Sequence, residues 1–475
     1  MEMTLPLLGA AVVLAAFLLF FLVKNNRCCW SPAAERRLRL PPGPWRLPLV
    51  GSLHHVLLSR HGDLPHRALR ELAGRYGALM LLRFGAVPTL VVSSAEAARE
   101  VLKTHDACFA SRHMTPTLAV FTRGGRDILF SPYGDLWRQL RRICVLELFS
   151  ARRVQSLRHV REDEAARLVR AVAEECAIGG GGGAVVPIGD MMSRMVNDSV
   201  VRSAIGGRCA RRDEFLRELE VSVRLTGGFN LADLYPSSSL ARWLSGALRE
   251  TEQCNRRVRA IMDDIIRERA AGKDDGDGED DLLGVLLRLQ KNGGVQCPLT
   301  TDMIATVIMG QDNLTEDDMS RLSYLHLVIR ETLRLHAPAP FLLPRECREQ
   351  CNVMGYDITE GTRVLVNAWA IARDTRYWED PEIFKPERFN ANLVDFKGND
   401  FEYIPFGSGR RVCPGITLGL TSMELVLASL LYHFDWELPG GKRCEEIDMS
   451  EAFGITVRRK SKLVLHATPR VPCLH

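Results

Sequence analysis

The sequence predicts a mainly α fold with a small β element, built as a single large domain behind an N-terminal transmembrane helix. Three observations support this prediction. An uncharged stretch of nineteen residues stands near the N-terminus, at residues 5–23. Most of the following chain shows the apolar spacing of amphipathic helices. Strand-like segments are few and short, as in a helical domain that carries one small sheet.

The composition is that of a globular protein. Hydrophobic residues make up 46% and charged residues 25% of the 475 positions. The net charge of +4 is small for this length, and no basic stripe with interleaved aromatic residues occurs, so a nucleic-acid partner is not expected. The thirteen cysteines are scattered and form no CxxC pair. This pattern argues against a zinc site or a disulfide framework.

The apolar stretch near the N-terminus predicts a membrane anchor. A helix over residues 5–23 rises about 28 Å, close to the thickness of the bilayer's hydrocarbon layer. Lys24, Arg27 and Arg36 follow it, which places the bulk of the chain on the cytoplasmic side. A cleaved signal peptide is the alternative, but this apolar core is long for one and no basic residue precedes it. We expect an anchor at residues 1–24, a basic and proline-rich hinge or linker at 25–51, and the main domain at 52–475.

The main domain alternates long helical segments with short strands. The expected strands are residues 79–83, 89–92 and 363–367. Two surface loops are predicted, a glycine run at 179–183 and an acidic segment at 272–281. The glycine run lacks the Lys-Ser/Thr ending of a phosphate loop. The expected helices are residues 63–74, 95–104, 133–148, 151–175, 240–271 and 416–434.

The strongest local signal is PFGSGRRVCPG at residues 405–415. Phe406, Gly409, Arg411, Cys413 and Gly415 fit the pattern F-x-x-G-x-R-x-C-x-G, which chance produces in such a chain about once in ten thousand. A cysteine just before a long helix is biased towards the thiolate form, which is a metal ligand. The flanking glycines let the backbone approach a flat ligand, and an arginine pairs with a carboxylate. The alternative is a buried structural cysteine in a glycine-rich turn.

Further motifs surround this segment in the chain. Glu331 and Arg334 form E-x-x-R, whose spacing puts both side chains on one helical face. Arg388 belongs to the segment PERF at residues 386–389, and Trp137 with Arg141 forms W-x-x-x-R. E-x-x-R alone is common on helix surfaces, so the order of the motifs along the chain carries the signal.

With these motifs in this order, the chain resembles the cytochrome P450 superfamily of haem-thiolate monooxygenases from the anchor to the C-terminus. Segments such as FASR and VNAWAIARD are similar to the plant microsomal clan, and most of all to grass members that oxidise terpenoids. The resemblance implies haem b (iron protoporphyrin IX) with Cys413 as the iron ligand. It also implies a buried charge network of Glu331, Arg334 and Arg388. The implied haem contacts are Trp137, Arg141, Arg345, Phe406, Gly409, Arg411 and Gly415.

The same resemblance implies a reaction and its partners. One oxygen atom from O2 enters a small lipophilic plant metabolite of terpenoid type, with NADPH electrons delivered by a membrane-bound NADPH-cytochrome P450 reductase. The expected location is the endoplasmic reticulum membrane, with a single pass and the catalytic body on the cytoplasmic side. Substrate contacts are expected in four mostly apolar segments, residues 114–128, 226–234, 337–343 and 453–457.

The chain departs from the family at MIATVIMGQDNLTEDD, residues 303–318. The family carries an acid–threonine motif in a long helix on the distal face of the haem, and this motif is absent here. Residues 302–309 match the start of that helix, whereas residues 310–318 match the loop before the E-x-x-R helix. Roughly fifty residues of the family pattern are therefore missing, the distal helix is truncated, and no catalytic proton donor is identified.

Two further hypotheses stand beside the monooxygenase. The first is a membrane-anchored product of alternative splicing or of an imperfect gene prediction, with impaired or no catalytic activity. It follows from the lost apolar burial, because at about 25 cal/mol per Å² a few hundred Å² approaches the net stability of a whole domain. The second is a haem-thiolate isomerase that uses neither reductase nor oxygen. Such relatives carry an enlarged cysteine loop, whereas this loop has the regular length.

Overall fold

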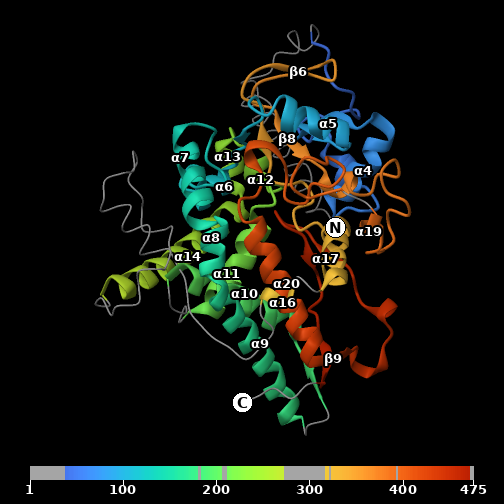
Figure 1. The fold of residues 1–475 in the computed structure, drawn as a ribbon. Coiled ribbons are helices and arrows are strands. Elements are labelled where there is room, and N and C mark those ends of the chain that lie inside the picture. Colours follow the sequence, from blue (N-terminus) through green and yellow to red (C-terminus); the bar gives the residue numbers. More distant parts are fainter. Residues whose placement is uncertain are drawn as a thin grey trace, which may run out of the picture.

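The computed structural model describes residues 38–179, 183–205, 211–271, 316–319, 322–391 and 394–470. In Figure 1 the main sheet and its helices form one part of the molecule, and the long helices α9, α14 and α20 form the other. The predicted membrane anchor, the first part of the hinge, the acidic loop and the junction at residues 309–310 lie outside the described residues.

The main sheet has five strands and is mixed. Its order is β1-β2-β8-β5-β3, with β1 and β2 forming an antiparallel hairpin and β8 running parallel to β2. Gly85, with a φ of +60°, makes the hairpin turn between them. The strands are β1 (Leu79–Phe84), β2 (Val87–Val92), β3 (Ser111–Arg112), β5 (Arg345–Glu346) and β8 (Arg363–Val366). The three predicted strands are therefore confirmed as β1, β2 and β8, which lie next to one another in this sheet.

Three smaller sheets complete the β structure of the described residues. A three-stranded sheet has the order β4-β12-β9 and ties the chain's last described strand to the helical part. The two others are short hairpins. The strands are β4 (Ala184–Val186), β6 (Cys351–Val353), β7 (Tyr356–Ile358), β9 (Phe434–Glu437), β10 (Glu451–Ala452), β11 (Arg458–Arg459) and β12 (Leu465–Pro469).

Short helices pack around the main sheet. Ser94 caps one of them by accepting a hydrogen bond from the Ala97 amide, and Asn367 caps another by accepting from the Ala370 amide. The helices near the sheet are α3 (Leu53–Leu57), α4 (Pro65–Tyr76), α5 (Ala95–Arg99), the π-turn η1 (Glu100–Thr104) and α18 (Ala368–Ile371).

The helical part contains the longest elements. The segment at residues 240–271, expected as one helix, is broken at Ser245, whose extended backbone ends α13 and whose hydroxyl accepts from the Leu248 amide to begin α14. The segment at 151–175 is likewise divided, at Leu157. The helices are α6 (Pro116–Phe121), α7 (Asp135–Ile143), the π-turn η2 (Cys144–Leu148), α8 (Ala151–Ser156), α9 (Arg158–Ile178), α10 (Ile188–Ile205), α11 (Arg212–Leu225), α12 (Leu231–Leu234), α13 (Ser239–Leu244), α14 (Gly246–Ala271), α16 (Glu316–Met319), α17 (Ser323–Leu335), α19 (Arg388–Ala391), α20 (Ile416–His433) and the 3-10 turns η4 (Gly409–Arg411), η5 (Pro439–Gly441) and η6 (Cys444–Glu446).

Helix α20 links the two parts of the core. Within the described ranges it is the one helix long and apolar enough to cross a membrane. It packs against α9, α16 and α17, and its second half contributes Leu425, Val426 and Leu430 to a buried cluster with α9 and β12. We therefore assign α20 to the protein core. It begins three residues after Cys413, so the packing of its second half fixes the position of that cysteine.

Replacing a core residue of the main sheet tests the packing. Leu90 on β2 is fully buried in the cluster between the sheet and α5. We expect Leu90→Ala to lower the free energy of unfolding by about 2–5 kcal/mol, because it removes buried methyl groups and leaves a cavity. Leu58→Ala is the control, since that side chain is 83% exposed and its loss should cost less than about 0.5 kcal/mol. Equal effects in urea denaturation would contradict the assigned core.

Candidate functional site

Cys413 lies between a 3-10 turn and the first turn of a long helix. Its amide donates to the Phe406 carbonyl at 3.0 Å, and the Val412 amide donates to the Gly409 carbonyl at 3.0 Å, so the loop folds back on itself. Gly415 occupies the N-cap of α20, and the thiol of Cys413 is exposed. The loop thus presents a free thiol at the amino end of an eighteen-residue helix, where amide groups point outward.

Glycine occurs at the two positions of the motif for different structural reasons. Gly409 has a φ of +69°, and a Cβ there would lie 2.2 Å from the Leu102 carbonyl oxygen. Close approach of the protein's own backbone therefore requires this glycine. Gly415 has an ordinary φ of −93°, and its nearest described neighbour to a Cβ is a Phe149 ring carbon at 3.9 Å. The fold itself leaves room for a side chain at Gly415. We therefore attribute the glycine there to the close approach of an external ligand and not to contact with the protein's own backbone.

Arginines hold this loop against the rest of the domain. Arg141 on α7 donates to the Val412 carbonyl at 2.7 Å, next to Cys413. Arg411 donates to the carbonyls of Ala110 and Ser131, and its guanidinium stacks 4.4 Å from the Trp137 ring centre. W-x-x-x-R and the cysteine motif therefore meet in space, although Arg141 and Val412 stand 271 positions apart in the chain.

Asp106 is a functional residue that the sequence did not single out. Its carboxylate accepts from Arg345 NH1 at 3.2 Å and from the amide and guanidinium of Arg410 at 3.0 and 2.9 Å. Arg345 also donates to the Ser408 carbonyl at 2.8 Å. One buried carboxylate thus joins β5 to the cysteine loop. A lone aspartate in a connecting segment gives no sequence signal for this role.

The loop region carries an excess of buried positive charge. The pKa of Arg411 is lowered to about 10, chiefly by burial and also by the charge of Arg345, while Asp127 opposes the shift. Burial lowers the pKa of Arg112 too, and so do the charges of Arg345 and Arg411. Guanidinium groups that repel one another in this way are stabilised by an added carboxylate.

The residues present fit a haem. Trp137 Nε1 is buried and has no hydrogen-bond partner among the described residues. This N–H group lies beside the arginines and can donate to an acceptor such as a propionate. In the first turn of α20, close after the cysteine in the chain, Ile416 and Leu418 are only partly buried, as apolar side chains against a flat apolar ligand would be. Thiol, cationic cluster, unpaired indole and apolar surface together suit a porphyrin with two carboxylates.

A second buried network lies on α17. Glu331 and Arg334 are completely buried, and the carboxylate accepts from Arg334 Nε at 2.7 Å and NH2 at 2.8 Å. Arg388 Nε and the Lys385 amide also donate to Glu331, at 3.1 and 2.9 Å. Burial raises the pKa of Glu331, but these donors and charges outweigh it, so the pKa lies below its usual value of 4.5.

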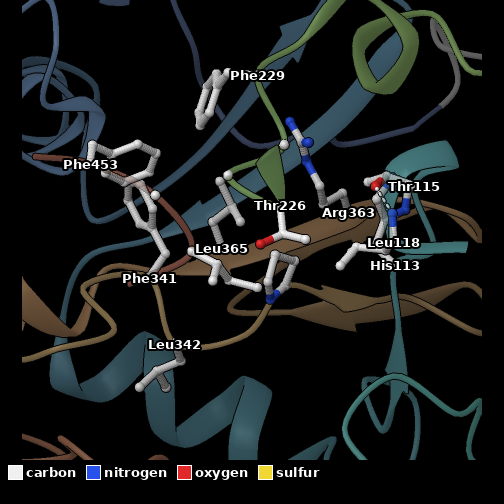
Figure 2. Close-up of a pocket in the computed structure, with 15 residues that line it drawn as sticks. His113, Thr115, Leu118, Thr226, Phe229, Phe341, Leu342, Arg363, Leu365 and Phe453 are labelled. Carbon is white, nitrogen blue, oxygen red and sulfur yellow. Dashed lines mark hydrogen bonds between the residues drawn. The ribbon is translucent and has the colours of Figure 1, made fainter. Parts of the chain in front are cut away.

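A cavity of about 30 Å³ lies between the main sheet and the helical part. Each of the four segments in which the sequence predicts substrate contacts contributes to its wall (Figure 2). From those segments come Thr115, Leu118, Thr226, Gly227, Gly228, Phe229, Phe341, Leu342, Phe453, Gly454 and Ile455. The lining also includes four residues that the sequence did not indicate, His113, Pro344, Arg363 and Leu365. They come from strand β8 and from the ends of short strands, where nothing in the sequence marks the side that faces a cavity.

Comparison of the sequence with known proteins places its similarities in one protein family. The family model described as Cytochrome P450 matches residues 41–309 and 282–465. A dolabradiene monooxygenase from Zea mays is 46% identical over 91% of this chain and 93% of its own length. An ent-isokaurene C2/C3-hydroxylase from Oryza sativa subsp. japonica is 47% identical over 90% and 92%, and a premnaspirodiene oxygenase from Hyoscyamus muticus is 42% identical over 93% and 95%.

These alignments also contain a gap in this chain. The alignment with the maize protein has 478 positions but takes in 91% of the 475 residues here, so about 45 positions have no residue of this chain. The two stretches of the family match overlap at residues 282–309, next to the position where the sequence predicts a junction.

Removing the buried carboxylate of α17 should destabilise the protein. We expect Glu331→Gln to cost about 3–5 kcal/mol near neutral pH, because Arg334 then keeps a buried charge without its partner. Since the pKa of Glu331 is lowered in the folded state, its contribution is full above about pH 4.5 and is lost as the pH falls below that value. The difference from wild type in urea unfolding should therefore shrink in acid. Glu379→Gln, at an 81% exposed side chain, is the control, and a difference that grows in acid would contradict the network.

Gly409 should tolerate no side chain. We expect Gly409→Ala to cost more than the roughly 1–3 kcal/mol of a left-handed backbone, because its Cβ also meets the Leu102 carbonyl. Gly419→Ala on α20 is the matched control. Nothing described lies within 4 Å of a Cβ there, and alanine favours a helix by up to about 1 kcal/mol. Thermal unfolding measures both, and equal melting temperatures would refute the assigned loop geometry.

Proposed function

The chain belongs to the cytochrome P450 family of haem monooxygenases, and on that premise we propose that it holds haem b through the Cys413 thiolate and oxidises a lipophilic terpenoid-type plant metabolite. When bound, haem b supplies the activation of dioxygen from which one oxygen atom is inserted. The residues of this chain bind and orient the group, exclude water and select the substrate.

The cysteine loop supports the haem part of the proposal. Cys413 is an exposed thiol whose backbone neighbour, Val412, is held by Arg141. Arg141, Arg411 and the unpaired Trp137 indole are the donors proposed for the propionates, with Arg345 held close by Asp106. Phe406 and Gly409 shape the loop, and Gly415 leaves its outer side open. This convergence of thiol and donors is the observation that carries the assignment.

The cavity supports the substrate part. Phe229, Phe341 and Phe453 line it, with ring centres 5.8 and 6.1 Å apart for the two pairs that involve Phe453. An aromatic wall with few polar groups suits a hydrophobic ligand. The relatives named above are a dolabradiene monooxygenase, an ent-isokaurene hydroxylase and a premnaspirodiene oxygenase, which supports a terpenoid for this chain.

A cationic surface beside the loop supports a reductase partner. The guanidinium groups of Arg138, Arg348 and Arg410 lie 5.3–5.7 Å from the ring centre of Tyr133. Arg138 and Arg410 are 54% and 45% exposed, so this surface can meet an acidic partner. We propose that NADPH-cytochrome P450 reductase binds there, with the chain anchored by residues 1–24 in the endoplasmic reticulum membrane.

A second candidate is a membrane-anchored haem protein that does not turn over substrate. The gap of about 45 aligned positions and the two-part family match favour it. So does the missing acid–threonine motif, since the sequence offers no other group to deliver protons to bound oxygen. On this view the chain binds haem and a lipophilic ligand, and its turnover with the reductase is little or none.

The carbon-monoxide difference spectrum of the reduced protein tests the haem site. With haem supplied during expression, we expect a thiolate-type Soret band that Cys413→Ala removes. Cys444→Ala is the matched control, because Cys444 is also a free and exposed cysteine but lies in η6, away from the loop. A thiolate-type band that survives Cys413→Ala would overturn the assignment.

Turnover separates the two candidates. The same preparation is mixed with the reductase, NADPH and a terpenoid hydrocarbon, and the product is followed by mass spectrometry. NADPH-dependent product rejects the inactive form. A normal spectrum without product supports it, and sequencing the transcript across the codons for Met309 and Gly310 then shows whether the junction exists in the message.

A further inference from the structure

The cavity has one buried polar group whose hydrogen bonds are incomplete. Arg363 on β8 is 3% exposed and lines the cavity beside the segment that carries Thr226 and Phe229 (Figure 2). Its Nε donates to Thr89 Oγ1 at 3.1 Å. Its NH2 has no hydrogen-bond partner in the described part of the chain. A buried N–H group without an acceptor loses its hydration and gains nothing in return.

The turn opposite Arg363 leaves space at the guanidinium. Gly228 has a φ of +77°, and a Cβ built there would lie 4.0 Å from Arg363 NH1. The glycine pair at 227–228 therefore brings backbone, and no side chain, to this end of the cavity. On the other side the guanidinium carbon lies 5.5 Å from the Phe84 ring centre. The unpaired NH2 thus belongs to a mainly apolar and aromatic lining, whose other polar side chains are His113, Thr115 and Thr226.

The charges around Arg363 decide what kind of acceptor fits. The buried carboxylate of Asp233 already accepts from the Thr117 amide, the Thr117 hydroxyl and the Asn230 amide group. Burial lowers the pKa of Arg363 to about 10, and the negative charge of Asp233 opposes that shift. Glu346 accepts from His113, whose pKa is lowered chiefly by burial. The carboxylates of Asp233 and Glu346 and the single charge of Arg363 thus act on the same region, so an anionic ligand would bring a further negative charge to a place that already holds two.

We propose that Arg363 is a specificity-determining residue that selects oxygenated substrates, its NH2 donating a hydrogen bond to a neutral hydroxyl or carbonyl oxygen. The cavity of about 30 Å³ has room for such a group and none for a terpenoid skeleton. The polar end of the ligand therefore enters the cavity, and its hydrocarbon part stays outside it. This inference rests on the proposed function, because it presumes a terpenoid-type substrate.

Three ligands of one skeleton test the proposal. The full chain, solubilised in detergent with haem supplied, is titrated calorimetrically with a diterpene hydrocarbon, its alcohol and its carboxylic acid. We expect the alcohol to bind about tenfold tighter than the hydrocarbon, the effect of one hydrogen bond to a charged donor, and tighter than the acid. In Arg363→Met this preference should disappear while the affinity for the hydrocarbon changes less than about twofold.

Two further variants keep the test decisive. Arg363→Lys retains a charged donor and should retain part of the preference, even if Arg363→Met fails to fold because it also loses the bond to Thr89. Arg458→Met, at an exposed arginine paired with Glu220, should leave all three affinities unchanged.

The contradicting outcomes are distinct. Equal binding of alcohol and hydrocarbon overturns the role of Arg363 and leaves the proposed function intact, since a water molecule then satisfies the donor. If the carboxylic acid binds more tightly than the alcohol and the hydrocarbon, the proposal that Arg363 selects a neutral oxygen is wrong. Binding of none of the three rejects the terpenoid class and the role of Arg363 together, while the carbon-monoxide spectrum still reports on the haem site.

Discussion

A completely buried carboxylate, Glu331, holds together the segments that surround the cysteine loop. It receives two hydrogen bonds from Arg334 on its own helix, one from Arg388 and one from the Lys385 amide. Arg334 in turn donates to the carbonyls of Ala372 and Pro381. These bonds fix the path from α18 to α19, which lacks regular secondary structure over most of its length and leads towards the loop. A buried charge in this position specifies one arrangement, because every alternative leaves an ion without a partner.

A similar principle positions the loop itself. Asp106 binds Arg345 from the main sheet and Arg410 from the loop, so one carboxylate sets the distance between the two. Arg411 donates hydrogen bonds to the backbone carbonyls of Ala110 and Ser131, and Arg141 donates one to the Val412 carbonyl. The loop is therefore rigid without help from a cofactor, whereas the Trp137 indole and the mutual repulsion of the arginines leave the site incomplete as a purely protein structure. A group that brings carboxylates completes it.

The segments that hold the cysteine loop lie on either side of residues 282–309, where the two stretches of the family match overlap. The described fold resumes at Glu316, whose carboxylate accepts from the buried Arg161 at 2.5 Å and whose amide donates to Glu162 at 2.9 Å. Helix α9 thus secures α16 and, through it, the approach to α17. The described hydrogen bonds that hold the cysteine loop come from Arg141, Arg345 and Arg411, which all lie outside that stretch of the chain.

The sequence by itself determined the mainly helical class, three strands of the main sheet, the cysteine loop, and the pairing of Glu331 with Arg334, because these depend on local periodicity and on motifs of fixed spacing. It also indicated the four segments that line the cavity. It did not indicate Asp106, Arg363 or the breaks at Leu157 and Ser245, and it gave two glycines of one motif the same role. Only the tertiary structure decided these, since the partner of a buried charge, the acceptor that a donor lacks and the atom that a Cβ would meet come from segments hundreds of residues away.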